Sequence, residues 1–207
     1  MTRKELKITA KQQLSNNWLK AILVIVIAFL ITGLSSYLSD IYYGGIWTYI
    51  LMSIVTFSIA TPLELGQSIF FLNLSKNKEG KISDLFLGYK SFIKVIGVGI
   101  LINIIVSIGL ILFIIPGFIL SIMYSQSYYI LAENPNIGIV ECLKKSRLIM
   151  NGQKWNYLVL MMSFILWILL TIITFGIAGL YVIPYYELTF TNFYLDIKNL
   201  KLDNLID

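Results

Sequence analysis

A run of 38 residues without a charged side chain, residues 95–132, limits the possible folds of this chain more than any other feature. As one continuous helix it would be on the order of 57 Å long, nearly twice the hydrocarbon thickness of a bilayer. The run must therefore fold back on itself. Pro116-Gly117 is the predicted reversal, because proline disfavours helix at the residue before it and glycine permits a tight turn.

The rest of the chain has the same apolar character. Hydrophobic residues make up 57% of the 207 residues and charged residues 13%, too few to cover a soluble core of this size. The apolar runs predict an all-α, polytopic membrane bundle that forms a single domain over residues 1–207. The six predicted spans are residues 21–39, 46–74, 95–115, 118–131, 155–174 and 180–197.

We expect the six spans to form three helical hairpins, each preceded by a cytosolic amphipathic helix. In the first of these helices Leu6, Ala10 and Leu14 follow one another every four residues, a stripe suited to the lipid headgroup zone. Segments 84–94 and 138–154 are the predicted counterparts before the second and third hairpins. Six aromatic residues at predicted span ends are expected to form interface belts: Trp18, Trp47, Trp155, Tyr42, Tyr43 and Tyr194.

The positions of the cations predict the orientation. All 16 Lys and Arg lie in residues 3–20, 76–94, 144–154 and 198–201, and the three predicted outer turns contain none. This asymmetry predicts a cell-membrane protein with both termini in the cytoplasm. The clusters flank apolar runs, which favours anionic lipids as partners over nucleic acid. The predicted headgroup contacts are Lys4, Lys7, Lys11, Lys20, Lys90, Lys94, Lys144, Lys145, Arg147 and Lys154.

The residue types available for catalysis are few. The chain has no histidine and one cysteine, Cys142, so it lacks the commonest general base, the usual zinc ligands and any disulfide. Neither HExxH nor GxSxG occurs, and the acidic residues are scattered. We therefore predict no catalytic residue, metal or cofactor and a non-enzymatic protein, with a lipid-modifying membrane enzyme as the less favoured alternative.

Two acidic residues, Glu64 and Glu187, lie well inside predicted spans. A charge at that depth costs a few kcal/mol or more unless it is paired or hydrated. Each glutamate also follows a proline, and the backbone carbonyl freed by that proline is a local partner for a protonated carboxyl. A binding role and a structural role are therefore both open. Asn103 and Gln126 are further candidate binding residues, with interhelical hydrogen bonding as the alternative.

Local bonding of both carboxyls favours a scaffold or accessory protein that interacts with lipids or envelope components. The alternative is a small secondary transporter or channel in which Glu64 and Glu187 meet at a cavity near the membrane midplane. Glu-Leu followed by two aromatic residues and leucine occurs at the same spacing in residues 64–72 and 187–195, as an internal repeat would require. A protein partner and a homo-oligomer remain open.

Motifs along most of the chain carry a family resemblance. They include Arg3-Lys4-Glu5-Leu6, Ile115-Pro116-Gly117, Tyr129-Ile130-Leu131-Ala132-Glu133-Asn134-Pro135 and Met150-Asn151-Gly152-Gln153-Lys154. These motifs resemble the bacterial membrane proteins catalogued as domain of unknown function 975. The resemblance implies a multi-span membrane protein, distantly similar to the membrane domain attached to some glycerophosphodiester phosphodiesterases. It implies no established activity.

Overall fold

The computed structural model describes residues 1–41 and 44–203, and the regular elements in this part are all helical. This confirms the predicted all-α class. In chain order the elements are α1 (Arg3–Leu14), α2 (Trp18–Ile41), α3 (Ile46–Ser75), the 3₁₀ helix η1 (Ile82–Ser91), α4 (Phe92–Leu112), α5 (Ile114–Tyr124), α6 (Ser127–Glu133), α7 (Ile139–Met150), α8 (Lys154–Met162), α9 (Ile165–Ile173) and α10 (Gly179–Asp203). Tyr42 and Tyr43 of the predicted first outer turn and aromatic belt lie outside the described residues.

Within the described residues, five helical segments are long and apolar enough to cross a membrane. They are α2, α3, η1 with α4, α5 with α6, and α8 with α9, and they match the first five predicted spans. The sixth predicted span forms most of α10, which is not among them. Thr189, Thr191 and Asn192 of α10 are buried inside the protein. Because α10 is largely enclosed by other helices, its side chains need not be as apolar as those of a lipid-facing helix.

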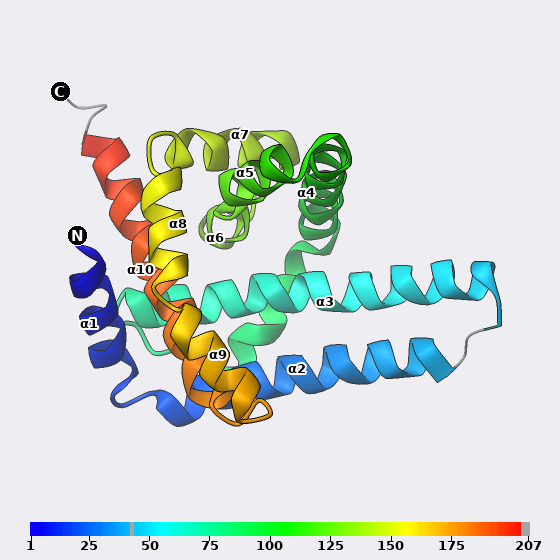
Figure 1. Cartoon of the computed structure of the whole chain (residues 1–207), viewed down its shortest axis with the longest axis horizontal. Helices are drawn as coiled ribbons and strands as arrows, with labels where there is room; N and C mark the ends of the chain where they lie inside the picture. Colours follow the sequence, from blue (N-terminus) through cyan, green and yellow to red (C-terminus); the bar gives the residue numbers. More distant parts are fainter. Residues whose placement is uncertain (42–43, 204–207) are drawn as a thin grey trace.

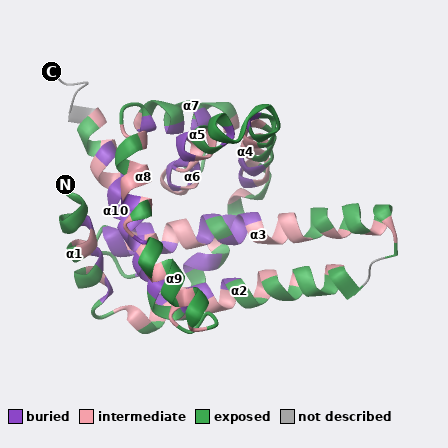
Figure 2. Ribbon diagram, viewed as in Figure 1, coloured by how far each residue is buried: buried purple, intermediate pink, exposed green. Residues whose placement is uncertain are grey.

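The helices α2 and α3 run side by side as a long arm that extends beyond the rest of the molecule (Figure 1). The residues at the far end of the arm are largely exposed (Figure 2). They include the large apolar residues Leu34, Trp47 and Leu51. A continuous exposed apolar surface of this kind is abnormal for a water-soluble monomer. It is the surface expected of helices that contact lipid.

The predicted reversal at Pro116-Gly117 is wrong by a few residues. The chain breaks at Phe113, whose backbone is extended, and Pro116 lies in the first turn of α5. Proline is tolerated there because the first backbone N–H groups of a helix have no intrahelical acceptor. The facing helices α4 and α5 pack closely, since a Cβ added to Gly109 would lie 2.9 Å from the Cα of Gly117.

Two of the predicted spans are interrupted helices. The break between α5 and α6 falls at Ser125 and Gln126, and the break between α8 and α9 falls at Ser163 and Phe164. The chain turns between α9 and α10, in the stretch between the last two predicted spans, with Phe175 at φ 51° and Gly176 at φ 91°.

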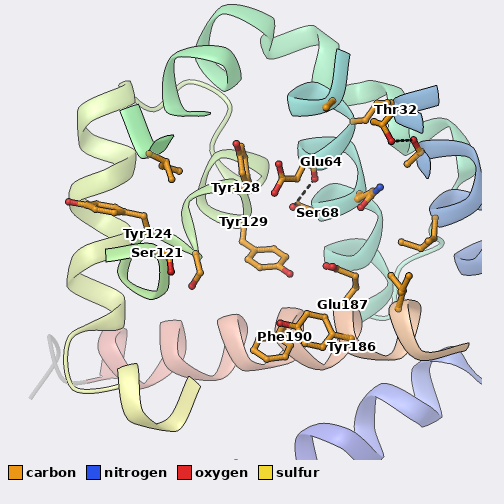
Figure 3. A pocket seen from close by; sticks show the side chains of 18 of the residues that line it. Thr32, Glu64, Ser68, Ser121, Tyr124, Tyr128, Tyr129, Tyr186, Glu187 and Phe190 are labelled. Atoms are coloured by element: carbon orange, nitrogen blue, oxygen red, sulfur yellow. Dashed lines mark hydrogen bonds between the residues drawn. The ribbon is translucent and has the colours of Figure 1, made fainter. Parts of the chain in front are cut away.

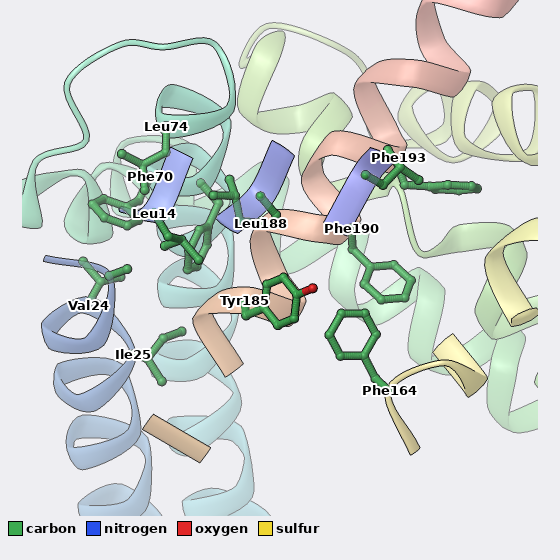
Figure 4. Packing of buried hydrophobic residues seen from close by; sticks show 14 of the residues in the cluster. Leu14, Val24, Ile25, Phe70, Leu74, Phe164, Tyr185, Leu188, Phe190 and Phe193 are labelled. Atoms are coloured by element: carbon green, nitrogen blue, oxygen red, sulfur yellow. The ribbon is translucent and has the colours of Figure 1, made fainter. Parts of the chain in front are cut away.

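The largest buried core forms where α1, α3 and α10 meet (Figure 4). The apolar stripe of α1 is almost completely buried there, with Leu6 2% exposed and Ala10 and Leu14 fully buried. The prediction that this stripe faces the headgroup zone is therefore wrong: it packs on protein. Amphipathic spacing alone does not distinguish these two partners, because both are apolar.

The 3₁₀ helix η1 lies directly on the backbone of α3. A Cβ added to Gly66 would overlap the carbonyl of Leu85, and one added to Gly88 would overlap the carbonyl of Pro62. The hydroxyl of Tyr89 donates a hydrogen bond of 3.1 Å to the carbonyl of Ile59, one turn before Pro62. These contacts with η1 hold in place the part of α3 that carries Glu64.

Candidate functional site

A cavity of about 750 Å³ lies among α2, α3, α4, α5, α6, α8 and α10. Glu64 lines it from α3, and Glu187 lines it from α10 (Figure 3). The two helices pack against each other, so carboxylates 123 residues apart in sequence face one space. Asn103 of α4, a third predicted binding residue, also lines this cavity.

The Glu64 side chain is accessible although its neighbours are not. Leu63 is 1% exposed and Leu65 is 2% exposed, whereas Glu64 is exposed and Glu187 is half-buried. Both glutamate residues also line the cavity. Both glutamates are thus available to a ligand.

Neither carboxylate has a hydrogen-bond donor or a cationic partner among the described residues. The bonds at these positions go to the backbone instead: Ser68 donates to the carbonyl of Glu64 at 3.0 Å, and Thr191 donates to the carbonyl of Glu187 at 2.8 Å. Among the described residues, no hydrogen bond joins either carboxyl to a carbonyl freed by the prolines. The binding role and the structural role of the two glutamates both stay predictions.

Tyrosines form much of the remaining wall, namely Tyr124, Tyr128, Tyr129, Tyr157 and Tyr186. The other polar lining residues are Thr32, Gln67, Ser68, Asn103, Ser121 and Ser125, and the lining contains no Lys or Arg. Sequence reasoning missed the tyrosines as site residues. The sequence does contain a pattern that could have indicated a polar site. Six consecutive residues that are polar or tyrosine, residues 124–129, interrupt an apolar run.

The two predicted amide residues have different positions. Asn103 donates from Nδ2 to the carbonyl of Gly99 at 2.9 Å, which leaves its side-chain oxygen available to the cavity. Gln126 does not line the cavity. Its Nε2 donates to the hydroxyl of Ser125 at 2.7 Å, and Ser125 does line it. Gln126 therefore supports the cavity wall from behind.

The helix breaks around the cavity are stabilised by side chains from distant segments. At the end of α5, Ser146 donates to the carbonyl of Met123 at 2.9 Å, and the Cys142 thiol donates to the carbonyl of Ser127 at 3.2 Å. Burial raises the pKa of Cys142 to about 12, which keeps the thiol protonated as a donor at neutral pH. Such partners satisfy backbone groups that an interrupted helix leaves free.

Beside the cavity, an ion-pair cluster ties together the C-terminal ends of α3, α6 and α10. Glu133, whose side chain is 7% exposed, pairs with Lys76 at 2.6 Å and with Lys198 at 2.7 Å, and it accepts a hydrogen bond from Tyr194. We call these four residues the Glu133 clamp. The Tyr194 ring stacks on Tyr129 of the cavity wall, with centroids 5.2 Å apart. Tyr194 is 1% exposed, so its predicted place in an interface belt is wrong.

Some predicted headgroup cations are engaged within the protein. Lys7 donates to the carbonyl of Ser163 at the α8–α9 break, at 3.0 Å, and lies 4.2 Å from the centroid of the Phe164 ring. Burial, with a contribution from Arg3, lowers the pKa of Lys7. Lys20 pairs with Glu79 at 3.3 Å. The exposed members of the predicted set are Lys4, Lys11, Lys90, Lys144, Lys145 and Arg147, while Lys94 and Lys154 are half-buried.

The described part of the chain holds no group of three or more His, Cys, Asp and Glu side chains that would suit a metal ion. Neither the curated proteins nor the solved structures contain a significant match. A family model does match: the one described as protein of unknown function (DUF975), over residues 1–120 and 104–201. Because these segments cover nearly the whole chain, the protein belongs to the DUF975 family.

Proposed function

We propose that this protein is a non-enzymatic membrane carrier for small organic cations, with Glu64 and Glu187 as the paired anionic groups of its binding site. The observation that carries the proposal is the convergence of two unpartnered carboxylates, from α3 and α10, on one accessible cavity. Ionisable groups at membrane depth generally face a bundle interior or a water-filled cavity and mark ion or substrate pathways.

The cavity lining supports a cationic ligand. It has two carboxylates and no Lys or Arg, which disfavours anions, and its tyrosine rings offer π faces to a cation. Its volume of about 750 Å³ falls in the range of about 300–1,000 Å³ that small-molecule sites occupy. An organic ammonium ion fills such a space better than a bare metal ion, for which the described residues offer no cluster of ligands.

The same geometry favours a carrier over a scaffold. A scaffold has no need for accessible carboxylates, and the local bonds that would have satisfied Glu64 and Glu187 are absent from the described residues. Two negative charges without a cation at membrane depth are costly unless water or protons offset them. We expect protons to occupy the site when no cation is bound, so that entry of a cation releases protons and couples proton movement to cation movement.

Contacts between chain segments support six spans, with α10 as the sixth. The Glu133 clamp joins residues that follow α3 with the ends of α6 and α10. Gln13 of α1 accepts a hydrogen bond of 2.9 Å from Asn192 of α10. Segments in contact at a membrane surface lie on one side, so an even number of crossings separates them. A crossing by α10 satisfies this condition, and the placement of Lys and Arg favours the cytoplasm of the cell for that side.

Flux in proteoliposomes tests the proposal. The purified parent, Glu64→Gln, Glu187→Gln and the double variant are reconstituted, and uptake of radiolabelled methylammonium and tetramethylammonium is driven by an imposed pH gradient. We expect saturable uptake by the parent and at least a tenfold loss in each variant, because one carboxylate alone cannot supply the paired site. Glu141→Gln, the same change at an exposed position on α7, is the control and is expected to match the parent.

If folded parent protein takes up neither probe faster than empty liposomes, the carrier proposal fails and the scaffold becomes the better account. If uptake occurs and both glutamine variants retain it, the cavity is not the site.

A further inference from the structure

A second hollow, of about 690 Å³, lies between η1, the start of α4, α3, and the loop after α6. It shares no lining residue with the carboxylate cavity. Leu65 and Ile69 contribute to it from α3, although Glu64 of the same helix lines the other cavity. The two hollows are therefore separate, and the carrier function proposed above has no use for the second one. We call it the η1 groove.

The lining of the η1 groove divides into an apolar and a cationic part. Leu65, Ile69, Leu87 and Leu131 are apolar, and no acidic residue is among the lining residues. The polar groups are Lys90, Ser91, Lys94 and Asn136. An elongated ligand with an apolar tail and an anionic head has chemistry complementary to both parts.

The two lysines retain the capacity to bind an anion. Lys90 is exposed and has no acidic partner among the described residues. Lys94 donates one hydrogen bond of 2.8 Å to the carbonyl of Pro135, and its remaining two N–H donors are free for a ligand. Their positive charges are therefore not neutralised within the described part of the chain.

The groove also lies where a lipid would reach it. Phe92 and Ile93, between the two lysines in sequence, are 42% and 82% exposed. Further along α4, Ile100 and Ile104 are also exposed. The cations thus lie at the end of an apolar surface of the kind that contacts acyl chains, which is the usual place of lysines near a headgroup layer.

We propose that the η1 groove is a binding site for an anionic phospholipid. The headgroup phosphate lies between Lys90 and Lys94, and one acyl chain lies along the apolar lining. Free phosphate is a weaker fit because it has no apolar part that could pack against the apolar lining. A zwitterionic lipid is a weaker fit because its headgroup cation meets two lysines. With about 1 kcal/mol from each lysine near an anionic headgroup, the preference for an anionic over a zwitterionic lipid is roughly tenfold or more.

Native mass spectrometry of the purified full chain tests the site. Bound phosphatidylglycerol and phosphatidylcholine with identical acyl chains are compared in the parent and in Lys90→Gln/Lys94→Gln. Lys78→Gln/Lys81→Gln removes the same charge at exposed lysines that neither line the groove nor belong to the predicted headgroup contacts. We expect the parent and this control to prefer phosphatidylglycerol about tenfold, and the groove variant to lose that preference. Lys90→Arg/Lys94→Arg keeps the charge and should retain it.

Two results would overturn the proposal. One is an unchanged preference in the folded groove variant, which would assign it to lysines elsewhere. The other is displacement of the lipid by millimolar inorganic phosphate, which would identify a free-anion site. Because lipid binding is measured without flux, neither result depends on the carrier proposal.

Discussion

Gly66 of α3 and Gly88 of η1 determine how closely these two elements approach, because each faces a backbone carbonyl of the other element where a Cβ has no room. Neither carbonyl can move away as the end of a flexible side chain can. We predict that Gly66→Ala or Gly88→Ala lowers the free energy of unfolding by about 1–3 kcal/mol or more, the range for overpacked sites. Thermal unfolding in detergent measures the loss.

Gly33→Ala on α2 is the matched control, since a Cβ there meets nothing within 4 Å. It is expected to leave the transition unchanged or to raise it slightly, because alanine favours helix over glycine. Equal melting temperatures for all three variants would show that η1 does not lie on α3 as described.

At the level of single residues, the sequence predicted Glu64, Glu187 and Asn103 because polar groups in apolar runs are conspicuous. It did not predict which of them converge. Convergence depends on the packing of α3 against α10, which no local pattern encodes. Gln126 satisfies the same sequence criterion as Asn103 and yet lies behind the cavity wall, because the break after α5 directs it there.

The helix breaks show the same limit for whole elements. The sequence predicted a reversal at Pro116, but proline is accepted in the first turn of α5 and the chain breaks at Phe113. The α8–α9 break contains neither Pro nor Gly. It is stabilised by Lys7, which is more than 150 residues away in the sequence and donates to the freed carbonyl of Ser163. Helix propensity and hydrophobic periodicity describe neighbouring residues only, so they cannot predict a partner at that separation in the sequence.

The Glu133 clamp joins three elements, so its loss is expected to lower stability. Glu133→Gln removes the charge shared by Lys76 and Lys198 and leaves two cations beside each other. Removing one partner of a buried pair costs about 3–5 kcal/mol, but these lysine side chains are 37% and 31% exposed, so solvent screens part of it. We expect a loss of about 1–3 kcal/mol in the free energy of unfolding.

The comparison is with Glu79→Gln, which breaks the Lys20–Glu79 pair between side chains that are 42% and 68% exposed. That change is expected to cost little, as exposed ion pairs generally do. A double-mutant cycle of Glu133→Gln with Lys198→Gln isolates the pair, and a coupling energy near zero would contradict the clamp.

At the scale of the whole molecule, counting apolar runs predicted the five helical segments that are long and apolar enough to cross a membrane. The prediction treated residues 180–197 as a span like the others. In the structure this segment belongs to α10, an inner helix whose Tyr185, Leu188, Thr191 and Asn192 are buried by protein. Mean hydropathy is high for a helix whose side chains face lipid. A helix that is enclosed by other helices can cross the membrane with more polar side chains, so a hydropathy criterion does not detect it. The contacts of α10 with α1 and with the ends of α3 and α6, rather than the composition of α10, favour its crossing the membrane.

Determining the side of the membrane on which α10 ends therefore decides between five and six crossings. We predict six crossings with residues 40–45 outside. In a Cys142→Ala background, Asp40→Cys is expected to react with a membrane-impermeant maleimide in intact cells. Lys4→Cys and Asn199→Cys are expected to react only after permeabilisation, and all three positions are exposed to the reagent. Labelling of Asn199→Cys but not Lys4→Cys in intact cells would mean five crossings. The contacts of α1 and of the Glu133 clamp with α10 would then have to span the membrane, which hydrogen bonds of about 3 Å cannot do.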